Sequence, residues 1–375
     1  MLRKLSVVVC AVAVTIGAQS KINPNLFFKI PHVGFILWAL TGHPMPPFLT
    51  RDMWKDGEHQ TWLRDGDLIV SVAAKSGTTW MLYCSHQVRT KGSDDIDFVD
   101  VMWSTPWPEM RQDPAHTWAL EKELMNTTVV PNGKLLREYW DNPRFPFRIF
   151  KSHENPREFG GSLPIRARPG VKFLAMVRNH LDQIASLVPF FNQHTDEFRA
   201  LWGGFPPASS GDPVKDAEAR LQDALPGGNL GHYFTPYVRS WWAMRHEPNV
   251  LLLHYADAVA DLEGTVRAIA DFVGVELTDA ERANVVRKCG MEHMKAHPQY
   301  FGYSAPLNPR VPADFRVVRS GSMTRTGGTG TGKAALTPEQ QARWRAVEEA
   351  EYTDPALLKW AREGGGAVGS FGDGE

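Results

Sequence analysis

Short apolar runs alternate with longer amphipathic segments along most of this chain. The short runs predict buried strands over residues 68–72, 147–150, 172–177 and 250–254. The longer segments predict helices over residues 79–88, 181–191, 233–245, 262–273 and 279–289. Because strands separated by helices favour parallel βαβ units, the expected fold class is α/β, with a central parallel sheet flanked by helices.

Two stretches interrupt this alternation, and the chain changes character toward its C-terminus. Residues 103–144 and 203–228 are rich in Trp, Pro, Met or Gly and predict loop-rich insertions. The expected organisation is one domain over residues 44–345, followed by a partly disordered C-terminal tail over residues 346–375. Disorder is expected chiefly for residues 364–375, because their glycine and polar content leaves little to bury.

The N-terminus has the layout of a secretory signal peptide. Arg3 and Lys4 precede an apolar run over residues 5–16, and Ala18 and Ser20 offer small side chains where cleavage is expected. The run is short for a membrane-spanning helix, which needs about 20 residues. A secretory-pathway leader within residues 1–40 is therefore favoured over a cytoplasmic location. Membrane association through this segment, or its burial in a cytoplasmic enzyme, are the other interpretations.

Composition narrows the classes of function. With 375 residues, 43% of them hydrophobic, the chain is long enough to bury a sizeable core. A net charge of −1 argues against a nucleic-acid partner, which would favour a basic surplus. The three cysteines, Cys10, Cys84 and Cys289, lie far apart without a CxxC pair, which excludes a disulfide scaffold and a cysteine zinc site.

The polar run after the first expected strand predicts an anion-binding site. A strand, a small-residue loop and the start of a helix together expose backbone N–H groups at the positive end of the helix dipole. Side chains of this run add a full charge and several hydroxyl donors, and its Ser and Thr are suited to cap the helix. The residues expected at the anion are Lys75, Ser76, Gly77, Thr78, Thr79 and Trp80. A plain polar turn between two buried elements explains the same residues.

Two more basic residues follow expected strands. Lys151 comes after residues 147–150, and Arg178 comes after residues 172–177. Because doubly wound sheets bind ligands beyond the carboxyl ends of their strands, Lys75, Lys151 and Arg178 are expected at one edge of the sheet. His153 lies two residues after Lys151 on an extended segment, so both side chains can point the same way. Its near-neutral pKa suits a general base.

A glycine-rich stretch over residues 327–333 matches the GxxxxGK spelling of a Walker A loop. The match fails because Ala334 stands where a magnesium-binding Ser or Thr is needed, and because residues 320–326 are too polar for the preceding strand. Glycines that let the backbone approach a phosphate, with Arg325 supplying charge, suit a phosphate loop of another kind.

Four motifs of the chain resemble those of the cytosolic-type sulfotransferases and occur in the same order along the sequence. These sulfotransferases have a P-loop-NTPase-like fold and use 3′-phosphoadenosine 5′-phosphosulfate (PAPS). The motifs cover residues 75–80, 151–153, 178–186 and 325–333. The resemblance implies that His153 takes the acceptor's proton, while Lys75 and Lys151 act on the leaving and transferring groups. It also implies a 3′-phosphate site made of Arg178, Ser186, Arg325, Thr326 and Gly327, with Ser186 holding Lys75 back until the acceptor binds.

The chain departs from the family pattern at several positions. Ala74 and His180 each replace a proline, and Thr326 replaces a basic residue, which removes one expected phosphate contact. Pro338 and Ala342 occupy two of the four positions of the family's dimer signature without matching it, so the oligomeric state stays open. Cys289 and Met291 fall loosely where the family contacts adenine, and Asp182 is expected to cap the start of its own helix.

The implied function is transfer of the sulfuryl group of PAPS to a hydroxyl or amine of a small, apolar or aromatic acceptor, without a metal. Aromatic pocket walls are expected in residues 103–107 and 190–205. One alternative is a nucleotide-binding but inactive sulfotransferase-like module. The other is a P-loop kinase, which would need an Asp at a strand end to hold magnesium.

Overall fold

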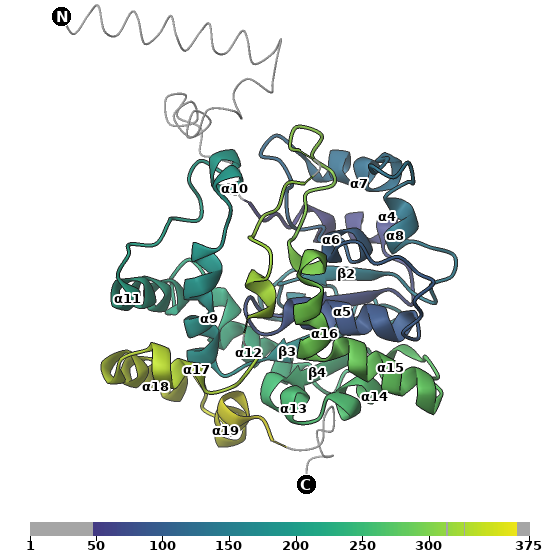
Figure 1. Cartoon of the computed structure of the whole chain (residues 1–375). Coiled ribbons are helices and arrows are strands. Elements are labelled where there is room, and N and C mark those ends of the chain that lie inside the picture. The colour runs from purple at the N-terminus through teal and green to yellow at the C-terminus, as the bar shows by residue number, and fades with distance from the viewer. Residues whose placement is uncertain (1–47, 313, 326, 366–375) are drawn as a thin grey trace, which may run out of the picture.

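Four parallel strands form the sheet at the centre of the fold (Figure 1). In the computed structural model, which describes residues 48–365 except 313 and 326, they lie in the order β2-β1-β3-β4. Their bounds are Leu68–Ser71 for β1, Ile149–Ser152 for β2, Lys172–Val177 for β3 and Val250–His254 for β4. The expected α/β class with a parallel sheet is confirmed.

The second strand begins two residues later than the sequence predicts. Its register with β1 pairs Leu68 with Ile149 and Val70 with Lys151, so Lys151 lies within the strand and not after it. Phe147 and Arg148 instead lead into the strand, and the Arg148 carbonyl accepts a hydrogen bond from the Leu68 N–H. Pairing with the neighbouring strand, which the local pattern does not report, sets this register.

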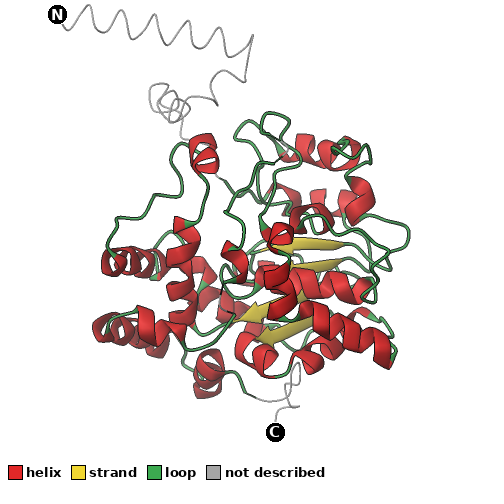
Figure 2. Cartoon of the chain, in the orientation of Figure 1, coloured by secondary structure: helices red, strands yellow, loops and turns green. Residues whose placement is uncertain are grey.

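Alternate side chains of the strands enter two hydrophobic layers, one on each face of the sheet. Ile69 and Phe173 belong to the layer that also holds side chains of α9 and α12, while Val70 and Leu174 belong to the layer that holds side chains of α5, α14 and α15. Helices therefore cover both faces of the sheet (Figure 2). These helices are α5 (Thr78–Arg89), α9 (His180–Asn192), α12 (Thr235–Ala243), α14 (Leu262–Val273) and α15 (Asp279–Cys289).

Both stretches that the sequence predicts to be loop-rich contain helices. Residues 103–144 include α7 and α8, and residues 203–228 include α11. Capping explains two of them: the Thr117 side chain accepts from the Leu120 N–H at the start of α7, and Asp212 caps α11, whose first residue is Pro213. The helices here and just before each stretch are α6 (Val101–Ser104), α7 (Trp118–Thr127), α8 (Arg137–Trp140), α10 (Asp196–Leu201) and α11 (Pro213–Ala224).

The ordered fold continues past residue 345, where the sequence places the end of the domain. Residue 345 falls within α18, and the following helix α19 packs against α12, with Leu357 and Trp360 buried. The expected leader over residues 1–40 lies outside the described residues, as do residues 366–375 of the tail. The other helices are α4 (Glu58–Trp62), α13 (Tyr255–Ala260), α16 (Met291–Ala296), α17 (Thr331–Ala335), α18 (Pro338–Glu351) and α19 (Pro355–Glu363).

Short 3₁₀ turns complete the connections: Asp52–Trp54, Arg157–Phe159, Gly231–Tyr233, Pro298–Phe301 and Ser322–Thr324. Within the residues that the structure describes, no helix is both long and apolar enough to cross a membrane.

Candidate active site

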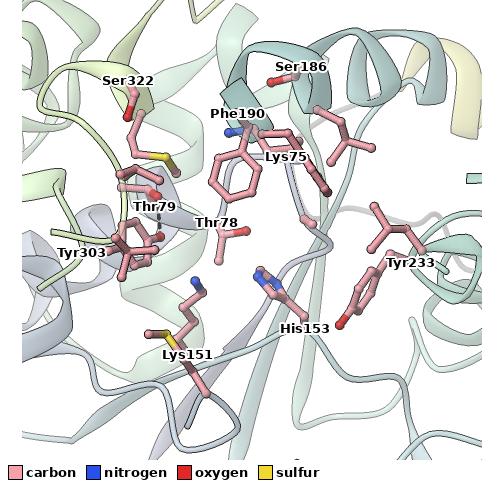
Figure 3. A pocket seen from close by; sticks show the side chains of 18 of the residues that line it. Lys75, Thr78, Thr79, Lys151, His153, Ser186, Phe190, Tyr233, Tyr303 and Ser322 are labelled. Carbon is pink, nitrogen blue, oxygen red and sulfur yellow. Dashed lines mark hydrogen bonds between the residues drawn. The ribbon is translucent and has the colours of Figure 1, made fainter. Parts of the chain in front are cut away.

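One cavity of about 660 Å³ opens beyond the carboxyl ends of the strands and gathers most of the predicted site residues (Figure 3). Ser76 is buried in the same loop but is not part of the cavity wall, and Thr326 lies outside the described residues. The predicted residues that line the cavity are Lys75, Gly77, Thr78, Thr79, Trp80, Lys151, His153, Arg178, Ser186, Arg325 and Gly327.

The loop after β1 turns tightly into α5. Lys75 and Gly77 both have positive φ angles, of 65° and 102°, and a Cβ on Gly77 would lie 3.1 Å from the Met176 sulfur. The sequence predicts a Ser or Thr cap, but Gly77 is the N-cap and provides no side-chain hydrogen bond. The Thr78 hydroxyl instead donates to the Val72 carbonyl at 3.1 Å. The first N–H groups of α5 therefore stay free of side-chain caps at the cavity.

Two buried polar atoms beside this loop have no hydrogen-bond partner within the described part of the chain. They are Ser76 Oγ and Arg178 Nε. The other guanidinium nitrogens of Arg178 donate at 3.0 Å to the carbonyls of Lys75 and Gly328, which fixes the arginine between two loops. Because buried donors are normally paired, these atoms fit a site that receives an acceptor-rich group such as a phosphate.

Lys75 lies against an aromatic ring. Its Nζ is 4.3 Å from the centre of the Phe190 ring, and Ser186 lines the cavity one helical turn before Phe190. Burial, together with the positive charges of Arg178 and Arg325, lowers the pKa of Lys75 to about 7. An anion in this cavity would reverse that effect and favour the charged ammonium.

The geometry of His153 leaves one ring nitrogen available as a base. Nδ1 makes a short contact with the Val72 carbonyl, and because a carbonyl only accepts, Nδ1 carries the proton. Nε2 of the neutral ring is then the proton acceptor. Burial lowers the pKa of His153 well below its usual value, and the charge of Lys151 acts in the same direction. The imidazole is therefore neutral at pH 7.

Lys151 is held between two rings. Its Nζ lies 3.4 Å from the Trp107 ring centre and 4.3 Å from that of Tyr303, while burial lowers its pKa well below the usual value. The Tyr303 hydroxyl is 2.6 Å from the Thr79 hydroxyl, which ties this wall to the anion loop. Figure 3 shows Lys151 and His153 on one side of Thr78 and Lys75 on the other.

The C-terminal glycine loop is anchored by a residue to which the sequence assigns another role. Asp182 does not cap its own helix, which Asn179 caps. The Asp182 carboxylate instead accepts from the N–H groups of Gly330 and Gly332, at 2.8 and 2.7 Å. Asp182 therefore fastens the glycine loop beside Arg178.

Of the residues that the sequence places in or near this loop, some line the cavity and others do not. Gly327 lines the cavity against Met291, and a Cβ on this glycine would lie 2.2 Å from the methionine methyl group. Cys289 contributes its carbonyl, which accepts from Trp80 Nε1 at 2.9 Å. Lys333 lies in α17, away from the cavity wall.

Several residues of the cavity carry no signal in the sequence. Phe48 and Tyr303 line the cavity but come from segments far from the four motifs, so their side chains reach the site only through the tertiary fold. Of the expected aromatic walls, Trp107, Phe190, Phe198 and Phe205 line the cavity, whereas Trp103 donates to Ser304 elsewhere. In the described ranges, no three His, Cys, Asp or Glu side chains are grouped to hold a metal ion.

Comparison with known proteins places the chain in a family. The sulfotransferase domain model matches residues 65–354. Mouse (Mus musculus) sulfotransferase 2A6 is 22% identical over 329 residues, which cover 85% of this chain and 96% of the relative. Rabbit (Oryctolagus cuniculus) amine sulfotransferase is 24% identical over 312 residues, which cover 80% of this chain and 85% of the relative.

Solved structures have the same fold. Retinol dehydratase in complex with androsterone and the inactive cofactor PAP matches with a TM-score of 0.55 at 18% identity, over 78% of this chain and 82% of that chain. Mouse sulfotransferase SULT7A1 complexed with PAP matches with a TM-score of 0.53 at 18% identity, over 80% and 90%. The chain belongs to the sulfotransferase domain family, as its four motifs predict.

Proposed function

We propose that this chain transfers the sulfuryl group of PAPS to a hydroxyl or amine of a small apolar molecule. The observation that carries the proposal is a single cavity that joins a cationic part to an apolar part, with a neutral histidine in its wall. Lys75, Arg178 and Arg325 supply the cationic part. A nucleotide that bears both a phosphosulfate and a 3′-phosphate carries negative charge that is complementary to these three basic side chains.

The residues around the anion loop fit the donor. The first N–H groups of α5, which have no side-chain cap, would bind the 5′-phosphosulfate. Arg178, whose Nε has no hydrogen-bond partner among the described residues, and Ser186 would bind the 3′-phosphate. Both solved relatives named above hold PAP, the product that PAPS becomes after transfer. These complexes support PAPS as the donor, and both the donor and the residue roles are our proposal.

The reaction follows from these roles. The acceptor oxygen or nitrogen attacks sulfur in line with the phosphate oxygen, and its proton goes to Nε2 of His153. The bond from sulfur to the phosphate oxygen breaks as the new bond to the acceptor forms, which yields the sulfated product and 3′,5′-ADP. Lys151 would offset charge on the sulfuryl oxygens, and Lys75 would stabilise the leaving phosphate.

The apolar part of the cavity favours an acceptor with an aromatic or alicyclic body. Its walls include Phe48, Trp107, Phe190, Phe198 and Phe205. Such walls gain little from a long acidic glycan, whereas they bury the rings of phenols, sterols and lipid alcohols well. Relatives in solved structures hold androsterone and retinol, which belong to that chemical range.

A transfer assay with labelled PAPS tests the proposal. The purified chain is incubated with panels of phenols, sterols, lipid alcohols, amines and sugars, and the labelled product is separated. We expect transfer to ring-bearing apolar acceptors. Binding of 3′,5′-ADP without transfer to any panel would support the inactive-module alternative. Turnover of ATP with magnesium, without a need for PAPS, would support a kinase.

A pair of histidine variants tests the proposed base. His153→Ala should lose transfer and keep its affinity for 3′,5′-ADP. His194 is a matched control, since it lines the same cavity and its Nδ1 also contacts a carbonyl, that of Phe190 at 2.9 Å, but its ring packs against Phe190 and Phe198 and not beside Trp107 and Lys151. His194→Ala should keep most of its kcat. Unchanged transfer by His153→Ala would rule out this residue as the base.

A further inference from the structure

Glu109 is a fully buried carboxylate that accepts four hydrogen bonds. It lies behind the part of the cavity wall that Trp107 and His153 form. It is 1% exposed. Oε1 accepts from Trp54 Nε1 at 2.9 Å and from the Ser152 hydroxyl in a short contact. Oε2 accepts from Trp107 Nε1 and from the main-chain N–H of His153, both at 3.1 Å. One side chain thus joins the end of β2 to the segment that carries Trp107.

The Trp107 ring that Glu109 holds contacts both proposed reacting groups, Lys151 at the end of β2 and His153 just after it. The Trp107 and His153 rings pack edge to face, with ring centres 4.9 Å apart at 80°. Its face carries Lys151 Nζ, 3.4 Å from the ring centre. A rotation of the indole would therefore move the base and the ammonium together.

We propose that Glu109 is a positioning residue for sulfuryl transfer, fixing His153 through its main-chain N–H and fixing both His153 and Lys151 through the Trp107 indole. The assignment rests on the proposed function, because it has meaning only if these two side chains act in transfer. Glu109 does not line the cavity and touches no substrate. Its effect is on the geometry of groups that do.

The charge of Glu109 adds a second effect on Lys151. The ionised carboxylate raises the pKa of Lys151, opposing the effect of burial and of the nearby Lys75. Burial and the charge of Glu154 raise the pKa of Glu109, the hydrogen bonds from Ser152, Trp107 and His153 lower it, and the net result is a pKa of about 7. Tyr233 also faces this carboxylate: burial raises the pKa of its phenol, and the charge of Glu109 acts in the same direction.

The substitution Glu109→Gln separates positioning from simple packing. It keeps the volume but turns one oxygen into an NH₂ group, which must face donors that the carboxylate now satisfies. We expect kcat to fall about 10- to 100-fold, as for a small misplacement of catalytic groups. The KM for PAPS and the affinity for 3′,5′-ADP should stay unchanged.

The pH profile gives a readout that a structural role would not move. Without the carboxylate charge, the pKa of Lys151 is lower, so the ammonium loses its proton at lower pH. The alkaline limb of kcat should therefore shift to lower pH in Glu109→Gln. Glu121→Gln is the matched control: Glu121 is 2% exposed and accepts from the Gln112 N–H and from His116, away from the cavity. This control should keep the wild-type kcat and pH profile.

Trp107→Phe provides an independent test if Glu109→Gln does not fold. Phe keeps an aromatic ring but cannot donate to Glu109, so kcat should fall while the affinity for 3′,5′-ADP is retained. The assignment is overturned if folded Glu109→Gln has the wild-type kcat and the wild-type alkaline limb of the pH profile. If Glu109→Gln does not fold, a wild-type kcat in Trp107→Phe overturns it. Absence of transfer by the wild-type chain itself overturns the proposed function, and the assignment with it.

Discussion

The anchoring of the glycine loop by Asp182 gives a prediction whose size follows from the structure. Its carboxylate is buried and accepts two short hydrogen bonds from the N–H groups of Gly330 and Gly332. Hydrogen bonds to a charged group contribute about 1.5–3 kcal/mol each. Asp182→Asn keeps one oxygen acceptor and replaces the other with a donor, so one of these bonds is lost. The free energy of unfolding should fall by about that amount.

The same loss should weaken nucleotide binding. The loop provides the Gly328 carbonyl that holds Arg178, together with Gly327 in the cavity wall. If the loop must be re-ordered when nucleotide binds, the energy of the lost bond is the upper limit of the loss in affinity. At about 1.4 kcal/mol for each factor of ten, the Kd of 3′,5′-ADP should rise, by at most about 10- to 100-fold.

Isothermal titration calorimetry with 3′,5′-ADP and urea unfolding measure the two effects on the same samples. Asp212→Asn is the matched control, because Asp212 also accepts from two backbone N–H groups at a helix start but lies outside the cavity wall. This control should keep the wild-type Kd. A Kd equal to wild type in a folded Asp182→Asn would refute the idea that this loop takes part in nucleotide binding.

Three further predictions concern charge, acceptor contact and processing. Because burial and two arginines lower the pKa of Lys75 to about 7, the lysine is largely neutral above that pH without ligand, and 3′,5′-ADP binding at pH 8.5 should take up protons. Calorimetry in two buffers of different ionisation enthalpy measures this proton uptake. Lys75→Met should reduce the uptake, and the same uptake in wild type and variant would contradict the prediction. Phe190→Leu removes the ring beside Lys75 and should raise the KM of aromatic acceptors more than that of PAPS; an effect on PAPS alone would refute the acceptor contact. The expected leader predicts that the full chain, expressed in a secreting host, yields a mature protein beginning near Lys21, and an uncleaved secreted or cytoplasmic product would contradict it.

The sheet was largely predictable because its strands are short apolar runs with clear ends. The bounds of β3, β4, α14 and α15 agree with the sequence prediction at both ends. The error at β2 has a different origin, since its register depends on pairing with β1. The sequence prediction lacks α7 and α11, because the Pro and Gly content of these stretches favours loops although Thr117 and the pair Asp212-Pro213 are recognisable start signals.

In the candidate site, too, the residues marked by local sequence could be predicted, and those placed by tertiary contacts could not. Lys75 and Arg178 could be placed together because residues that follow parallel strands meet at one sheet edge. Glu109 could not, since nothing in its local sequence distinguishes a buried carboxylate with four donors from a surface one. The contact between Lys75 and Phe190 also depends on how α9 packs, which no spacing of residues reports. Site residues in motifs near strand ends can therefore be predicted from the sequence, whereas the residues that support them can be identified only in the tertiary structure.

Transfer of labelled sulfuryl from PAPS by the purified chain tests the central claim most directly. The assay is run with apolar ring-bearing alcohols, with and without EDTA, on the wild type and on His153→Ala. We predict label on the acceptor that persists in EDTA and is lost in the variant, while the variant still binds 3′,5′-ADP. The account is contradicted if the wild type transfers no label to any acceptor, and ATP hydrolysis with magnesium would then favour the kinase alternative.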